Sequence, residues 1–310
     1  MTEDIYQLNL PGLREDNPRD FIAALGLLRL IDLQWPDLGA SLAWDVAQGY
    51  PILGTIQELP ADWSAQITSS LHELVRDSVK TPKGPLFHGS IIKTSFNAYR
   101  EAIAEAQLFG EAHPELPFAA LPGMLYAAYS DQTPDKDGNV NATSFSMANN
   151  PSGKAIFKFI HGYITKLKQD CISTTVLGTA KRCAIKGIRW DPAENRPAAY
   201  CAGDPQDEPD VLDFPAKNVL AFIGLSLFPC APSARKKLVL GIRVNDKSDK
   251  FPIFRWATWT SPLSPSVIFS LLGVPDQYAT AQSLGLHRYW ASFRITDKNK
   301  NNYFSSATSS

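Results

Sequence analysis

Residues 17–31 of this sequence read NPRDFIAALGLLRLI, a pattern that predicts a helix. Asn17 is a residue type that caps helices, Pro18 follows at the first helical position, and Asp20 places a carboxylate in the first turn. The residues after Asp20 are apolar almost all round, which is typical of a helix surrounded by protein on most sides. Gly26 costs about 1 kcal/mol of helix propensity and indicates that another backbone packs closely there. We therefore predict a buried helix that makes a close backbone contact at Gly26.

The rest of the sequence predicts an α+β fold, with a mostly helical N-terminal lobe followed by a lobe with an antiparallel sheet and packed helices. Helices are predicted at 64–78, 95–109, 118–129, 152–168, 215–227 and 264–273, where apolar residues recur at helical spacing. Strands are predicted at 183–190, 237–244, 254–260 and 287–296, where β-branched and aromatic residues concentrate. The predicted strands therefore all fall in the second half of the chain.

Turn-forming residues are dense over 130–141, and this stretch predicts a boundary between two lobes. Residues 1–130 are expected to form an acidic, mostly helical lobe, and residues 143–296 a basic α+β lobe. The polar residues 297–310 are expected to form a flexible tail. A chain of 310 residues, 44% of them hydrophobic, can also fold as one continuous domain, which is the alternative.

The charge of the chain is divided unevenly between its two halves. Residues 1–153 contain 9 Lys and Arg against 19 Asp and Glu, whereas residues 154–310 contain 21 against 12. The net charge of −1 at pH 7 therefore hides an acidic half of −10 and a basic half of +9. A basic lobe attracts phosphate backbones or an acidic partner surface, whereas an acidic lobe repels polyanions.

The sequence lacks the patterns of membrane, secreted and metal-binding proteins. No run approaches 18 apolar residues, and the N-terminus is acidic without a hydrophobic segment, so we expect a cytoplasmic protein without membrane contact. Cys171, Cys183, Cys201 and Cys230 form no CxxC pair and no zinc pattern, so we expect reduced thiols and no metal or cofactor.

Catalytic signatures are missing as well. Ser152-Gly153-Lys154 is similar to the end of a phosphate-binding loop, but Ala148 stands where that loop needs its first glycine. The five histidines form no HExxH motif, and no serine lies in a GxSxG motif. We therefore expect a protein that is not an enzyme, and a site assembled from distant residues is the remaining alternative.

Basic residues are densest between positions 154 and 189, where eight Lys and Arg accompany one carboxylate, Asp170. Such a surface binds a polyanion with strong salt dependence, but an acidic protein would be attracted equally, and a solvated helix face has the same composition. The residues that we select as phosphate contacts are Lys154, Lys158, Lys181, Arg182, Lys186 and Arg189. The acidic segment 191–213 is expected to be a solvated loop, with closure over the basic surface as the alternative.

A second candidate surface lies on the predicted strand 287–296. Alternation assigns Tyr289, Ala291, Phe293 and Ile295 to the core face and Arg288, Trp290, Ser292, Arg294 and Thr296 to the opposite face. Arginines beside an exposed aromatic ring bind single-stranded nucleic acid by phosphate contact and base stacking. We therefore select Arg288, Trp290 and Arg294 as further contacts. The alternative is a half-buried Trp290 whose neighbouring arginines form surface ion pairs.

Several segments together resemble a known family. Residues 17–30 are similar to the N-terminal signature of accessory and large-subunit proteins of type I-G (formerly I-U) CRISPR systems. The segments 143–145, 189–192, 218–229 and 289–294, and the helix after Gly153, are similar to segments of the same proteins in the same order. The chain is much shorter than the large subunit, so it more closely resembles a small companion protein or the family named as an extension of the CRISPR helicase-nuclease. It lacks the helicase motifs and the HD pair, so neither activity carries over.

The resemblance implies a non-catalytic subunit of a CRISPR interference complex guided by crRNA. The basic lobe would contact crRNA, target DNA or both, and the partners would be other effector subunits, with the helicase-nuclease among the candidates. A protein-interaction adaptor that docks an acidic partner without nucleic acid is the second hypothesis. An enzyme with an unrecognised site is the third.

Overall fold

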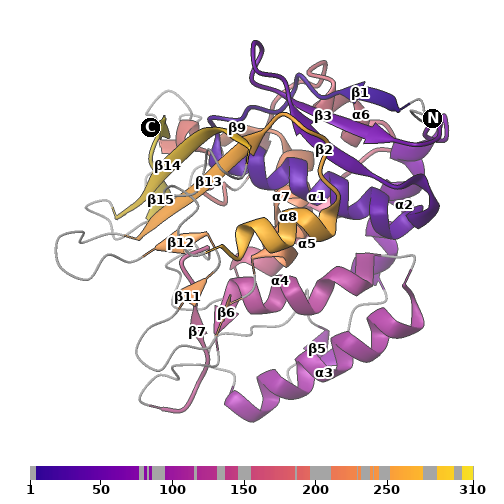
Figure 1. Cartoon of the computed structure of the whole chain (residues 1–310). Helices are drawn as coiled ribbons and strands as arrows, with labels where there is room; N and C mark the ends of the chain where they lie inside the picture. The colour runs from indigo at the N-terminus through magenta and orange to yellow at the C-terminus, as the bar shows by residue number, and fades with distance from the viewer. Residues whose placement is uncertain are drawn as a thin grey trace.

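Helix α1 (Pro18–Gln34) runs through the core, as the sequence predicts (Figure 1). The Oδ1 atom of Asn17 accepts hydrogen bonds from the backbone N–H groups of Arg19 and Asp20 at 3.0 and 3.2 Å. The helix therefore begins where the capping pattern places it. Residues 18–28 are all buried, so the helix is covered on every side.

The computed structural model describes residues 5–76, 80–81, 84–85, 95–114, 117–130, 137–145, 155–185, 187–195, 211–228, 230–231, 238–239, 241–243, 252–274, 285–296 and 302–309. The other helices in this part are α2 (Trp63–Arg76), α3 (Phe96–Ala112), α4 (Leu121–Ala128), α5 (Ala155–Ile164), α6 (Cys171–Val176), α7 (Pro215–Gly224) and α8 (Pro265–Leu272). Short 3₁₀ turns are η1 (Pro36–Leu38), η2 (Pro117–Ala120), η3 (Pro192–Asn195) and η5 (Leu225–Leu227). Within the described residues, no helix has both the length and the apolar composition needed to cross a bilayer.

The strands form antiparallel sheets, so the fold is α+β, as predicted. The largest sheet has the order β10 (Cys230–Ala231), β11 (Leu238–Val239), β12 (Ile242–Arg243), β13 (Ile253–Trp259), β14 (Leu286–Thr296) and β15 (Asn302–Phe304), and β16 (Thr308–Ser309) also pairs with β14. A three-stranded sheet has the order β1 (Tyr6–Asn9), β3 (Pro51–Thr55), β2 (Ser41–Trp44). The remaining pairs are β4 (Lys80–Thr81) with β5 (Gly84–Pro85), β6 (Tyr129–Ser130) with β7 (Asn141–Ala142), and β8 (Cys183–Ile185) with β9 (Val211–Asp213).

Three predictions about strands need correction. The first half of the chain was predicted to be mostly helical, but it contains the sheet β1–β3–β2, whose strands of four or five residues are too short to give a clear pattern. The segment 237–244 contains the paired strands β11 and β12 instead of one strand, and Gly241 between them has a φ of 76° that favours glycine. In the segment 183–190, β8 ends at Ile185, and Arg189 has a φ of 64°, which is incompatible with a strand.

Helices α1 and α7 meet at two glycines. A Cβ atom at Gly26 would lie 1.8 Å from the carbonyl oxygen of Leu220 on α7, and one at Gly224 would lie 2.1 Å from the carbonyl oxygen of Ile22 on α1. The close backbone contact predicted at Gly26 is therefore confirmed. Helix α1 belongs to the first half of the chain and α7 to the second. Their contact is part of one continuous hydrophobic cluster that contains buried residues of both halves.

Gly26→Ala is expected to destabilise the protein by about 1–3 kcal/mol or more, because the new methyl group would collide with backbone that cannot rotate away. Thermal or urea unfolding followed by circular dichroism measures the loss. The matched control is Gly162→Ala in α5, where a Cβ atom meets nothing within 4 Å. This control is expected to gain a few tenths to about 1 kcal/mol from helix propensity. Equal responses of the two variants would contradict the contact between α1 and α7.

The C-terminal segment is part of the sheet, so the prediction of a flexible tail is wrong for residues 302–309. Strand β15 pairs with residues 294–296 of β14, and β16 pairs with residues 290–291. Phe304 is fully buried beside Phe145 and Phe254. One aromatic side chain thus anchors a segment whose composition is otherwise polar, and composition alone did not show this.

Candidate anion-binding cavity

A cavity of about 880 Å³ lies between α5, α6, β8 and the start of α7. Most of its wall comes from residues 158–185, and residues 214–216 complete it. Strand β8 pairs with β9 through Cys183 and Asp213, and this pairing brings Phe214 next to the basic segment. The fold therefore wraps much of the basic run around a single hollow.

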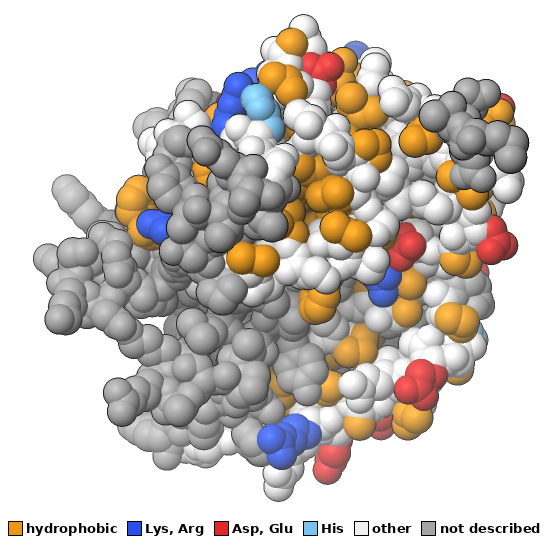
Figure 2. Space-filling view, viewed as in Figure 1, with side chains coloured by type: hydrophobic (Ala, Val, Ile, Leu, Met, Phe, Trp, Pro, Cys, Tyr) orange, Lys and Arg blue, Asp and Glu red, His pale blue; other side chains and the backbone are white. Residues whose placement is uncertain are grey.

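Four lysines line the cavity: Lys158, Lys166, Lys168 and Lys181. All four are exposed, and Asp170 is the one carboxylate among the described lining residues. Four ammonium groups against one carboxylate leave a local charge of +3, which attracts anions. On the face shown in Figure 2, the described Lys and Arg side chains are scattered among hydrophobic and uncharged ones.

The inner wall of the cavity is apolar. Phe159 and Phe214 are half-buried there, whereas Tyr163, Leu167 and Ile185 are buried. A charged rim around an apolar interior suits a ligand that combines anionic groups with a flat apolar part. The guanidinium carbon of Arg182, the residue after Lys181, lies 5.6 Å from the centroid of the Phe214 ring and adds a cation beside the rim.

Two thiols also line the cavity. The sulfur of Cys171 accepts a hydrogen bond from the backbone N–H of Lys168 at 3.2 Å. Burial raises the pKa of the Cys183 thiol, Asp213 and Cys171 raise it further, and Lys166 opposes them. A raised pKa favours the protonated thiol, which is a poorer nucleophile than a thiolate.

A cluster of buried charges fixes the start of α7 beside the cavity. The Arg19 guanidinium contacts Asp213 at 2.5 Å and Asp191 at 2.7 Å. It also contacts Asp20 at 3.1 Å, and the Lys217 ammonium contacts the other Asp20 oxygen at 2.7 Å. These five side chains are at most 10% exposed, so water screens their interactions very little. The cluster thus joins α1, β9, α7 and the turn after residue 190.

Neutral donors complete the cluster. The side-chain amides of Asn17 and Asn218 donate to Asp191 and Asp213, each at 3.0 Å. Burial alone lowers the pKa of Arg19, but Asp191, Asp213 and Asp20 together raise it well above its ordinary value. Burial raises the pKa of Asp191, but Arg19, the backbone N–H of Ala193 and the Asn17 amide outweigh burial and lower it overall.

Glu194 stands next to this cluster without a lysine or arginine within ion-pair distance among the described residues. It is 4% exposed, and its Oε2 atom accepts a hydrogen bond from the backbone N–H of Arg189 at 2.9 Å. Burial raises the pKa of Glu194 to about 8, and the neighbouring Asp213 acts in the same direction. Glu194 is therefore a carboxyl group that keeps its proton near neutral pH.

The expected solvated loop at 191–213 is corrected by these contacts. Its described carboxylates Asp191, Glu194 and Asp213 are buried, because Arg19 needs buried counter-charges. Residues 196–210 lie outside the described part of the chain. The sequence signal for this cluster is the pair Arg19 and Asp20 at the start of a helix that is otherwise apolar almost all round.

The first predicted set of contacts is partly brought together. Lys158 and Lys181 line the cavity, and Arg182 lies beside it. Lys166 and Lys168 line it too, although they were not selected. Arg189 is half-buried in the turn held by Glu194, away from the described cavity wall. Lys154 and Lys186 lie outside the described residues.

The predicted faces of β14 need correction. Trp290 pairs with the buried Trp256 of β13, and Ser292 pairs with the buried Phe254, so the even-numbered residues lie on the face that packs against α1. Phe293, predicted to be in the core, is 39% exposed, whereas Tyr289, predicted for the same face, is buried as expected. Alternation identifies two faces of a strand but does not say which one a helix covers.

The second predicted set of contacts is therefore less open than expected. Trp290 is half-buried against the core. Arg288 forms an ion pair with the buried Glu15, and its guanidinium carbon lies 5.7 Å from the centroid of the Trp290 ring. Arg294 is half-buried, and this burial lowers its pKa. The contacts agree with the alternative of a half-buried tryptophan beside ion-paired arginine.

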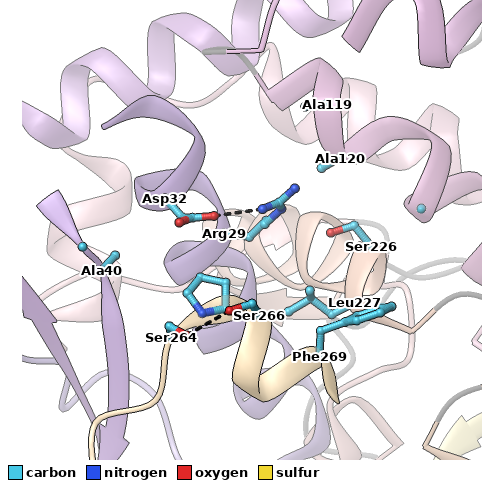
Figure 3. A pocket seen from close by; sticks show the side chains of 13 residues that line it. Arg29, Asp32, Ala40, Ala119, Ala120, Ser226, Leu227, Ser264, Ser266 and Phe269 are labelled. Atoms are coloured by element: carbon cyan, nitrogen blue, oxygen red, sulfur yellow. Dashed lines mark hydrogen bonds and ion pairs between the residues drawn. The ribbon is translucent and has the colours of Figure 1, made fainter. Parts of the chain in front are cut away.

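A second cavity, of about 490 Å³, lies between α1, α4 and α8 (Figure 3). Its charged groups are Arg29 and Asp32, which form an ion pair at 2.8 Å, and the hydroxyls of Ser264 and Ser266 lie 3.1 Å apart. Because the described charges balance, this cavity attracts anions less than the lysine-lined one.

A comparison with protein-family models and with curated proteins finds no match to this chain.

Proposed function

We propose that this protein binds nucleic acid without catalysing a reaction on it, as a subunit of a CRISPR interference complex. The observation that carries the binding proposal is the set of four exposed lysines around one cavity, with one described carboxylate among them. Lysines neutralise phosphates and release counterions, which supplies most of the affinity of sequence-independent binding. The CRISPR assignment, with crRNA or target DNA as ligand, rests on the family resemblance of the sequence.

The test is a filter-binding titration of single-stranded RNA and DNA at 50 and 200 mM salt. If the four cavity lysines each contact one phosphate, a plot of the logarithm of the association constant against the logarithm of the salt concentration should have a slope of about −3. Lys158→Glu/Lys181→Glu is expected to weaken binding at least tenfold at low salt and to make the slope shallower.

The control is charge reversal of the exposed Arg100 on α3, which should leave binding within twofold. If the wild-type protein shows no salt-dependent binding to either nucleic acid, the proposal is wrong. If the protein instead purifies with an acidic protein after nuclease digestion and binds no nucleic acid, the adaptor hypothesis is correct.

A further inference from the structure

We infer that the cavity takes single-stranded nucleic acid, with one or two nucleotides entering it, and that duplexes are excluded. This inference rests on the proposed function and adds the form of the ligand. The volume of the cavity, about 880 Å³, falls within the range of small-molecule sites and far below what a duplex needs. A paired base enters such a pocket only after it has left the helical stack, at a cost of a few kcal/mol.

The arrangement of charge and aromatic surface in the cavity also favours a single strand. The lysines are exposed at the rim, whereas Phe159 and Phe214 are half-buried and Tyr163 is buried. A nucleotide matches this order when its base points inward and its phosphates remain among the lysines. Sites for single strands combine cations along the backbone with aromatic surfaces for the bases. The bases of a duplex are hidden from such surfaces.

The described wall of the cavity offers few free donors that could distinguish one base from another. Thr174 and Thr179 line the cavity, but their hydroxyls donate to the backbone carbonyl oxygens of Asp170 and Thr174, at 2.8 and 3.2 Å. These donors are therefore engaged before a base enters. Stacking is tolerant of sequence because every base has a flat face. Engaged donors and stacking surfaces together favour a single strand without a strong sequence preference.

The experiment measures fluorescence anisotropy with three RNA probes of equal length: a single strand, the same strand with abasic residues, and a duplex. The wild-type protein should bind the single strand at least tenfold more tightly than either other probe at equal salt. Phe159→Ala should weaken single-strand binding about tenfold and abasic binding less than twofold. Phe269→Ala, a change of a 44% exposed phenylalanine on α8, is the matched control and should change neither.

A second readout uses the native thiol of Cys183, which lines the cavity and is exposed. Saturating single-stranded RNA should slow its alkylation by N-ethylmaleimide at least fivefold, as measured by mass spectrometry. Equal salt-dependent binding of all three probes would overturn this inference and leave the proposed function in place. If no probe shows salt-dependent binding, the proposed function itself is overturned.

Discussion

Arg19→Ala is expected to lower the free energy of unfolding by about 3–5 kcal/mol. The Arg19 side chain is 1% exposed and contacts three carboxylates within 3.1 Å. Its removal leaves Asp191 and Asp213 buried without their main counter-charge, and an alanine cannot replace the five donors of a guanidinium. Urea unfolding followed by circular dichroism measures the loss.

The matched control is Arg14→Ala, which removes an exposed ion pair. Arg14 and Asp16 are 57% and 44% exposed and lie 3.4 Å apart, so the change should stay within about 0.5 kcal/mol. Arg19→Ala/Asp191→Asn should recover part of the loss, because it also removes one of the unpaired charges. Equal losses for Arg14→Ala and Arg19→Ala would show that the buried cluster does not hold the fold together.

The cluster connects the stability of the fold to the cavity. Asp213 and Lys217 flank Phe214, and both are held by residues of α1. The Lys217 ammonium also lies 5.1 Å from the centroid of the Phe214 ring. Phe214 is therefore fixed from the buried side, while the four lysines that line the cavity stay exposed. A side chain that its neighbours hold in place can position a ligand precisely.

The helices were predicted well from the sequence because the signals for a helix lie within a few neighbouring residues. The Asn17 cap, the apolar run and Gly26 all act within a few residues, and the structure agrees with each of them. The partners of Arg19 could not be predicted this way, since Asp191 and Asp213 are more than 170 residues away. The same limit applies to β14, whose core face depends on how β13 packs against Phe21 of α1.

The candidate site was predictable in its charge but not in its shape. A high local density of lysine led directly to Lys158 and Lys181, and both line the cavity. The aromatic wall was missed, because Phe159 has the helical spacing of an ordinary core residue and Phe214 joins the site only through the pairing of β8 with β9. Which exposed lysines surround a hollow is a property of the tertiary structure.

The stability of this protein is expected to fall as pH rises from about 4.5 to about 8, because of Glu194. Burial raises the pKa of Glu194 from 4.5 to about 8, so in this interval the folded state holds a proton that the unfolded state has released. The unfolded state then binds fewer protons, and the free energy of unfolding decreases by up to about 1.4 kcal/mol for each pH unit. Below pH 4.5 and above pH 8, Glu194 has the same protonation in the folded and unfolded states. Its contribution to the free energy of unfolding then does not change with pH.

Glu194→Gln isolates this effect, because glutamine is similar in shape to a protonated glutamate and does not titrate. Arg19 and Lys217 face three other carboxylates, so ionised Glu194 adds a fourth buried negative charge to two positive ones. Urea unfolding at pH 5, 6, 7 and 8 should give a smaller slope in the variant than in the wild type. The contribution of Asp191 has the opposite sign and lies below its ordinary pKa of 3.8, outside this interval. Equal slopes in the two proteins would show that Glu194 is ionised throughout, and the carboxyl would then need a cation that the described cluster does not supply.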